Sequence, residues 1–191
     1  MPSARRRAAA DPDEASLVSQ VARGDEVAFE ALFRRYDARL RRFVEQMIRR
    51  PYLVDEILND TMLLVWRKAH TFNLRSKVST WIIGIALRRG LQALRNRDEA
   101  TGLDPDTTAL PAEHGPEGQL LRQELRARLN GALGVLPAQQ RAVIELTFYE
   151  GYTYQEIATI MDCPVGTVKT RMFHARRRLK ELLAERKEEA A

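Results

Sequence analysis

Apolar residues recur at helical spacing over most of the chain. Between residues 29 and 47 they share one face of a single helix, and this stripe comprises Phe29, Leu32, Phe33, Tyr36, Leu40, Phe43, Val44 and Met47. Such a stripe is typical of an amphipathic helix that buries one side. Asp25 is a suitable N-cap for it, and Pro51 predicts its end.

A second helix is predicted from about residue 53 to 69. Its buried stripe comprises Val54, Ile57, Leu58, Thr61 and Val65, and its opposite face carries Asp55, Glu56, Asn59, Asp60 and Leu63, with Trp66 close by. Acids in a first turn favour the helix dipole, which accounts for Asp55 and Glu56 but not for Asp60. A face that mixes acids with apolar groups predicts a protein-docking surface.

A third helix is predicted from about residue 79 to 97, and it has two distinct faces. The buried stripe comprises Ile83, Leu87, Gly90, Leu91 and Leu94, whereas another face carries Trp81, Ile85, Arg88, Gln92 and Arg95. A Trp followed by Arg and Gln suits a nucleic-acid groove. The alternative is that Trp81 packs inward and the arginines are simply solvated. The polar loop just upstream, residues 72–79, could receive an extruded base.

The C-terminal third of the chain predicts four helices. One spans Leu121 to Leu133, and a second is opened by Pro137 and ends at Gly151. Thr153 and Glu156 then form a capping box, which begins a short helix. A turn at Asp162-Cys163-Pro164 leads into a last helix over about residues 165–183, whose buried stripe comprises Val168, Met172, Ala175, Leu179 and Leu182.

The spacing of these last two helices is that of a helix-turn-helix. Ala158 allows close helix approach, Asp162 tolerates positive φ at the turn, and Val168 anchors the second helix. The second helix of this motif enters the major groove, so its exposed polar residues would contact DNA. The alternative is an ordinary basic helix in a helical bundle.

Charge is divided into blocks along the 191 residues, although the net charge is only +5. Residues 28–97 carry 15 basic and 6 acidic side chains, and residues 122–191 carry 12 basic and 9 acidic. Between them, residues 98–121 carry six acids and no Lys or Arg, together with several Pro and Gly. This composition predicts two basic modules joined by a flexible linker.

Several function classes find no support in the sequence. Cys163 is the only cysteine, which excludes an internal disulfide and fits a reducing compartment. No run approaches the 18 apolar residues of a membrane helix. The three histidines are scattered, so no metal-ligand cluster is expected, and no phosphate loop or nucleophile–base pair predicts an enzyme or a cofactor.

Together, these motifs resemble those of bacterial sigma factors. The segment Asp55–Trp66 resembles the helix that binds core RNA polymerase, and Ser79–Ala86 with Arg88 and Arg89 resembles the helix that melts and reads the −10 element. Tyr154–Ala158 and Cys163–Arg171 look like the −35-binding motif. The order and the short linker are similar to the extracytoplasmic-function subfamily, and the resemblance covers about residues 25–187.

The resemblance implies an all-α architecture of two small helical domains joined by a flexible acidic linker. We expect a flexible N-terminal tail over residues 1–24, a sigma region 2 domain over 25–97, the acidic linker over 98–118, a four-helix region 4 domain with the helix-turn-helix over 119–187, and a tail over 188–191.

It also implies three sets of contact residues. The residues expected to bind core polymerase are Asp55, Glu56, Asn59, Asp60 and Leu63. Those expected to bind the −10 element are Asn73, Arg75, Lys77, Trp81, Arg88, Arg89, Gln92 and Arg95. Those expected at the −35 element are Thr153, Gly166, Thr167, Lys169, Thr170, Arg171, His174, Arg177 and Arg178.

The partners implied are the β and β′ subunits of core RNA polymerase, promoter DNA and an anti-sigma factor. We expect a cytoplasmic protein that is a monomer when free, inserts in no membrane, uses no cofactor or metal and catalyses nothing itself. Two other functions remain open on the sequence: a dimeric helix-turn-helix regulator that is not a polymerase subunit, and a helical interaction protein with no nucleic-acid role.

Overall fold

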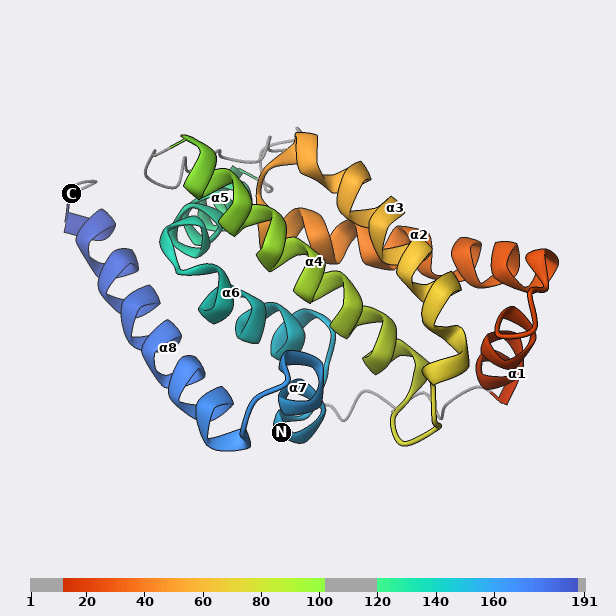
Figure 1. The fold of residues 1–191 in the computed structure, drawn as a ribbon. Coiled ribbons are helices and arrows are strands. Elements are labelled where there is room, and N and C mark those ends of the chain that lie inside the picture. The colour runs from red at the N-terminus through yellow and green to blue at the C-terminus, as the bar shows by residue number, and fades with distance from the viewer. Residues whose placement is uncertain (1–11, 102–119, 189–191) are drawn as a thin grey trace.

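The computed structural model describes residues 12–101 and 120–188, and every regular element within them is helical (Figure 1). The first group is α1 (Pro12–Val21), α2 (Glu26–Ile48), α3 (Pro51–Lys68), the 3-10 turn η1 (Ala69–Thr71) and α4 (Val78–Thr101). The second is α5 (Leu120–Val135), α6 (Ala138–Ile144), the π-helical turn η2 (Glu145–Tyr149), α7 (Tyr154–Met161) and α8 (Val165–Glu188). The predicted all-α class is therefore confirmed.

The first domain is built on the predicted stripes of α2, α3 and α4. The Asp25 side chain caps α2 by accepting a 3.0 Å hydrogen bond from the Ala28 amide. α2 ends at Arg49, which adopts the left-handed conformation with φ 57°, and Pro51 occupies the first turn of α3. The largest side chains sealed between these helices include Tyr36, Leu40, Phe43, Ile57, Ile82 and Leu87.

Two predicted boundaries are corrected. Residues 12–21 were expected to lie in a flexible tail, but they form α1, which packs on α2 and buries Val18 and Val21. Its ten residues carry too short an apolar stripe to be recognised from the sequence. The helix expected to end at residue 97 continues to Thr101, so the first residues assigned to the acidic linker are helical. The rest of that predicted linker, and both predicted termini beyond residues 12 and 188, lie outside the described residues.

The second domain contains the helix-turn-helix. The predicted capping box at the start of α7 is present in full. Asp162 adopts the left-handed conformation, with φ 50°, and accounts for the tight turn between α7 and α8. Val168 and Met172 of α8 are buried against α6 and α7, and Ile160 of α7 is buried as well.

The two domains pack directly against each other. α4 runs beside α7, and α6 and η2 lie against α2 (Figure 1). One apolar core is continuous across the boundary, joining α4 residues such as Ile82 and Ile85 to Ile157 and Ile160 of α7. We call this packing the closed arrangement. Among the described helices, none combines the length and the apolar character that crossing a bilayer requires.

Candidate nucleic-acid interface

The loop before α4 presents several of the predicted −10 residues to solvent. Asn73 and Arg75 are exposed, and the Asn73 side chain accepts a 3.1 Å hydrogen bond from the Arg75 amide. Between them, Leu74 adopts φ 61° and is 68% exposed. An apolar side chain held in this uncommon conformation at a loop tip is a candidate contact residue. Sequence pattern alone could not predict this, because the backbone conformation is what exposes Leu74.

The exposure of Trp81 is intermediate between the two predicted alternatives, a ring that faces DNA and a ring that packs inward. The residue is half-buried, and its ring packs on Phe72 with a centroid separation of 5.2 Å and an angle of 40°. The ring therefore braces the loop while part of its surface remains accessible. Further along α4, Arg88, Gln92 and Arg95 are exposed, as the predicted polar face requires. Ile85, which was assigned to the same face, is buried and does not belong to it.

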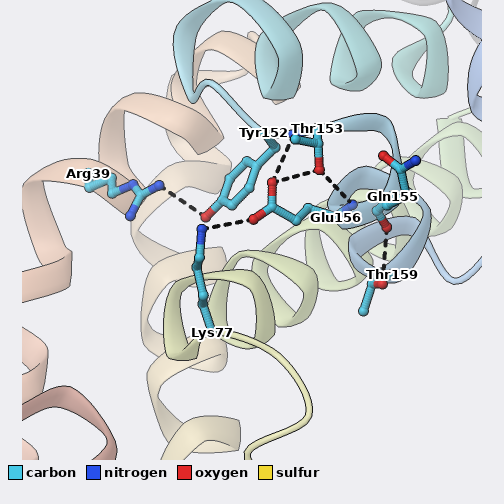
Figure 2. A network of polar contacts seen from close by, with 7 residues as sticks. All are labelled: Arg39, Lys77, Tyr152, Thr153, Gln155, Glu156 and Thr159. Carbon is cyan, nitrogen blue, oxygen red and sulfur yellow. Dashed lines mark hydrogen bonds and ion pairs between the residues drawn. The ribbon is translucent and has the colours of Figure 1, made fainter. Parts of the chain in front are cut away.

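Two predicted −10 residues contact the second domain. Lys77 Nζ donates to Glu156 Oε1 at 2.9 Å, and Arg88 Nη1 approaches the Ile160 carbonyl at 3.5 Å (Figure 2 shows the Lys77 contact). Close backbone packing accompanies these contacts, since a Cβ on Gly84 would lie 3.3 Å from the Ile160 oxygen. α4 thus faces the helix-turn-helix along part of its length.

Arg39 of α2 joins the same junction. It donates to the Tyr152 hydroxyl at 3.0 Å (Figure 2). It also donates to Glu150 at 2.7 Å, and its guanidinium carbon lies 5.6 Å from the centre of the Tyr152 ring. The Glu150 side chain is only 4% exposed, and Arg42 lies 3.4 Å from its second oxygen. Glu150 is shielded from water while Arg39 is one-third exposed, so loss of Arg39 would leave a buried carboxylate without its nearest partner.

Glu156 links the junction to the capping box. Its carboxylate accepts hydrogen bonds from the Thr153 amide at 2.9 Å and the Thr153 hydroxyl at 2.8 Å, besides the one from Lys77. Burial alone would raise the pKa of Glu156, but these hydrogen bonds outweigh it and the pKa is lowered. The Thr153 hydroxyl was predicted to meet DNA, and in this structure it is occupied by the cap.

The acidic face of α3 is accessible, as predicted. Asp55, Glu56, Asn59 and Leu63 are exposed. Asp55 pairs with Arg41 at 2.8 Å. Asp60 is half-buried and pairs with Arg89 of α4, so one residue assigned to the polymerase surface is bonded to one assigned to the −10 surface. The remaining residue near this face, Trp66, is half-buried and packs on Phe29 at 5.1 Å.

The predicted −35 residues lie along one side of α8. The exposed members are Gly166, Lys169, Thr170, His174, Arg177 and Arg178, whereas Thr167 and Arg171 are half-buried. Thr170 returns a hydrogen bond to its own helix, at 3.0 Å from the Gly166 carbonyl. Arg171 turns back to the sulfur atoms of Met161 and Cys163, at 3.9 and 3.4 Å. The first turns of α8 therefore keep several polar groups available for base edges.

Exposed aromatic residues beside α8 were missed by the sequence analysis. Phe173 is 62% exposed on α8 and contacts the His174 ring edge-on at 5.5 Å. Phe148 and Tyr149 of η2 are also exposed, and Arg176 covers the Phe148 ring at 5.5 Å. Phe173 falls outside the buried stripe predicted for α8, so the sequence pattern already indicated that its side chain is exposed. Phe148 could not be found this way, because the π-helical turn changes the periodicity.

In residues 12–101 and 120–188, no group of three or more His, Cys, Asp or Glu side chains is arranged to hold a metal ion. The chemistry available here is that of basic, aromatic and amide groups on helices, which suits binding to a nucleic acid or a protein.

Known protein families match both domains. The model of sigma-70 region 2 matches residues 32–100, and the model of sigma-70 region 4 matches residues 126–179. The chain is 30% identical to the RNA polymerase sigma-H factor of Pseudomonas aeruginosa over 178 residues, covering 87% of this chain and 92% of that protein. It is 32% identical to the ECF RNA polymerase sigma-E factor of Escherichia coli K12, covering 84% and 88%.

Solved structures have the same fold. The sigma factor RpoE of Bartonella quintana, crystallised with the anti-sigma factor NepR, matches with a TM-score of 0.67 and 26% identity over 82% of this chain and 96% of that one. CnrH, solved with the cytosolic domain of CnrY, matches with a TM-score of 0.65 and 23% identity over 91% and 98%. On the two region models and these full-length relatives, the chain belongs to the extracytoplasmic-function sigma factors of RNA polymerase.

Proposed function

We propose that this sigma factor binds core RNA polymerase through α3 and directs initiation at promoters that it reads with α4 and α8. The observation that carries the proposal is the separation of two kinds of surface. The exposed residues of the acidic and apolar α3 face, Asp55, Glu56, Asn59 and Leu63, lie on a different helix from the basic faces of α4 and α8, although Asp60 at the edge of this face pairs with Arg89 of α4. A regulator that binds duplex DNA without polymerase would need only a basic face such as that of α8. The protein itself would catalyse no reaction.

The −10 contacts would stabilise opened DNA rather than read a closed duplex. Extruding a base costs a few kcal/mol, and stacking on a side chain returns about 1–3 kcal/mol per base. The loop with Asn73, Leu74 and Arg75, backed by Trp81, offers one place for an extruded base. Arg88, Gln92 and Arg95 would then hold the strand that leads away from it.

The −35 contacts would come from α8 in the major groove. Residues at the start of the recognition helix meet base edges, and later basic residues meet phosphates. Lys169, Thr170 and His174 fit the first role, with Phe173 as an added apolar contact to a thymine methyl. Arg177 and Arg178 fit the second, and both lie within 3.7 Å of Glu181, which would orient them.

DNA binding would require the closed arrangement to open. Lys77 and Arg88 cannot grip a DNA strand while they contact α7. Polymerase that holds the domains on separate sites would keep them apart and raise the effective concentration of each for its promoter element. Residues 102–119 could reach at most roughly 60 Å when extended, which permits such separation.

Control by an anti-sigma factor is part of the proposal. The RpoE structure that this chain resembles contains the anti-sigma factor NepR. A partner that holds the two domains together, or covers α3, would keep this chain from polymerase. We further expect the free chain to be a cytoplasmic monomer, with the β and β′ subunits of polymerase as its other protein contacts.

The polymerase surface can be tested with charge reversals on α3. Glu56→Arg is the cleaner change, because Glu56 is exposed and takes part in no ion pair among the described residues, whereas Asp60→Arg also breaks the Asp60–Arg89 pair. Both should lower the affinity for purified core polymerase by about tenfold or more, since like charges at an interface are strongly disfavoured. Glu26→Arg, on the exposed start of α2, is the matched control. Unchanged polymerase affinity in both α3 variants would contradict the assignment of α3 as the docking surface.

A second measurement separates this function from that of an independent regulator. If the chain elutes as a dimer and binds a duplex tightly without polymerase, the regulator is supported instead. A sigma factor should elute as a monomer and bind promoter DNA weakly until core polymerase is added.

A further inference from the structure

A large basic cavity lies where the two domains meet. Its volume is about 1140 Å³, and it is bounded by the ends of α2 and α4, the turn between α5 and α6, and the start of α8. Six of its lining residues are arginines, and no acidic residue is among the described residues that line it. The arginines are Arg49, Arg50, Arg88, Arg95, Arg141 and Arg171.

Two of these arginines are buried, and the described part of the chain satisfies their guanidinium groups only partly. Arg49 is 4% exposed and Arg141 is 8% exposed. None of the three guanidinium nitrogens of Arg49, nor Nε of Arg141, has a hydrogen-bond partner among the described residues. Arg141 Nη2 donates to the Leu136 carbonyl at 3.2 Å. A buried cation that lacks partners is costly, and a neighbouring anion would offset much of that cost.

The described residues supply only part of the counter-charge for this pair. Desolvation lowers the pKa of Arg141 to about 10, and the nearby positive charge of Arg49 adds to the effect. Glu145 is close enough to oppose both charges, but its own burial raises its pKa to about 7. Near neutral pH it is therefore only partly ionised, and the cavity keeps a positive potential.

The other lining residues suit the uncharged part of an anionic ligand. Ile48, Leu91 and Leu94 form an apolar wall on the first domain, and Gln92, Gln139 and Gln140 bring amide groups from both. Guanidinium groups pair with phosphate oxygens in a bidentate fork, and amides and apolar walls accept the edges and faces of a planar ring. Ligand sites in proteins commonly enclose about 300–1000 Å³, so this cavity is large enough for a nucleotide.

We propose that this junction cavity binds a phosphate-bearing small molecule of the nucleoside polyphosphate class, and that the bound molecule stabilises the closed arrangement. Arg88 and Arg95 come from α4, and Arg141 and Arg171 come from the second domain. A ligand held by both sets bridges the domains. It binds the closed form and not the open one, so it shifts the balance toward the closed form by mass action. It also occupies arginines that the proposed function assigns to promoter DNA.

Calorimetric titration of the free full-length chain tests the site directly. The probes are GTP, inorganic pyrophosphate and inorganic phosphate, each at constant ionic strength, with hexaglutamate as a polyanion that carries no phosphate. We expect the affinity to be highest for GTP, lower for pyrophosphate and lowest for phosphate. Small-angle scattering should show a more compact chain when GTP is bound. Absence of binding by all three phosphate probes overturns the proposal. Binding of hexaglutamate as tight as that of GTP also overturns it, in favour of an acidic protein segment.

Variants separate a binding role from a structural one. Arg49→Gln should weaken GTP at least tenfold while the ligand-free melting temperature stays equal or rises, because an uncompensated buried charge is removed. Arg95→Gln changes an exposed residue at the rim of the cavity and should lower the affinity for GTP several-fold. It replaces Arg49→Gln as the test if that variant folds poorly. Arg67→Gln, exposed on α3 outside the cavity, is the matched control. Equal GTP affinity in Arg49→Gln, Arg95→Gln and the control contradicts the site. None of these measurements involves polymerase, so they stand apart from any failure of the proposed function.

Discussion

Lys77 donates a 2.9 Å hydrogen bond to Glu156, the same acid that completes the capping box of α7. The loop that precedes the −10 helix is thereby tied to the first residues of the helix-turn-helix. Under the proposed function, each domain covers part of the surface that the other would use on DNA. The closed arrangement and promoter binding would then be competing states of one chain.

The Arg39–Glu150 pair should be the strongest single polar contact that holds the domains together. Removing one partner of a buried ion pair costs about 3–5 kcal/mol, and the nearby Arg42 should keep the loss for Arg39→Met at the lower end. Opening lets water solvate Glu150, so the variant should shift toward the open form. Small-angle scattering should report a larger radius of gyration. Arg34→Met, which breaks only an exposed pair with Glu30, is the control, and equal dimensions of the two variants would count against this role.

Gly84 should limit how closely α4 and α7 can pack. A Cβ there would already lie 3.3 Å from the backbone oxygen of Ile160, so a leucine side chain has no room in the closed form. Gly84→Leu should push the domains apart and raise the affinity of the free chain for a promoter duplex several-fold. Gly166→Leu, at a position with open space, should leave the scattering profile unchanged. A compact Gly84→Leu chain would show that the contact is not limiting.

Stability should fall as pH rises through neutrality because of Glu145. The carboxyl is protonated in the folded chain up to about pH 7, whereas in the unfolded chain it ionises near its ordinary value of about 4.3. A raised carboxyl pKa means that the folded state holds the extra proton between these values, so stability is lost across this window as pH increases. The loss is on the order of 3 kcal/mol at about 1.4 kcal/mol per unit.

Urea denaturation at pH 5 and pH 8 checks this dependence. Glu145→Gln cannot ionise, so its stability should change less between the two pH values, and at pH 8 it should exceed that of the unmodified chain. Arg42, Arg49, Arg141 and Glu150 are the charged groups around Glu145, and all remain in the variant. Parallel pH profiles for the two proteins would refute the assignment.

The capping box should contribute about 1 kcal/mol to the second domain. Thr153→Ala removes the hydroxyl that accepts from the Glu156 amide, and loss of an N-cap typically costs 0.5–2 kcal/mol. Thr153→Ser keeps the hydroxyl and should retain most of the stability. Thermal melts of the three proteins give the comparison. If Ala and Ser melt at the same temperature, the cap is not what stabilises α7.

The sequence was sufficient for the helices and their buried faces because 3.6-residue periodicity is local. The stripes of α2 and α3, the cap at Thr153 and the left-handed Asp162 all follow from residue types at fixed spacing. The same reasoning missed α1, whose ten residues carry too short a stripe. It also missed Phe148, because the π-helical turn η2 shifts the register.

The contacts between domains could not be predicted in this way. Nothing local relates Lys77 to Glu156, which are 79 positions apart, or Arg39 to Tyr152, which are 113 apart. The exposed Leu74 depends on a backbone angle. The Arg49 guanidinium, which has no hydrogen-bond partner among residues 12–101 and 120–188, depends on what the second domain covers. Candidate contact faces could be read from helix patterns, but their mutual obstruction and the basic cavity appear only in three dimensions.

In vitro transcription with purified core polymerase and a library of genomic fragments decides whether the chain is a promoter-specific initiation factor. We expect that adding the chain selects a small set of start sites that share two spaced upstream elements, and that Lys169→Ala and Arg88→Ala each weaken the selection. Core polymerase alone should not select these sites. The same start sites with and without the chain, or none at all, would contradict its assignment as a promoter-specific initiation factor.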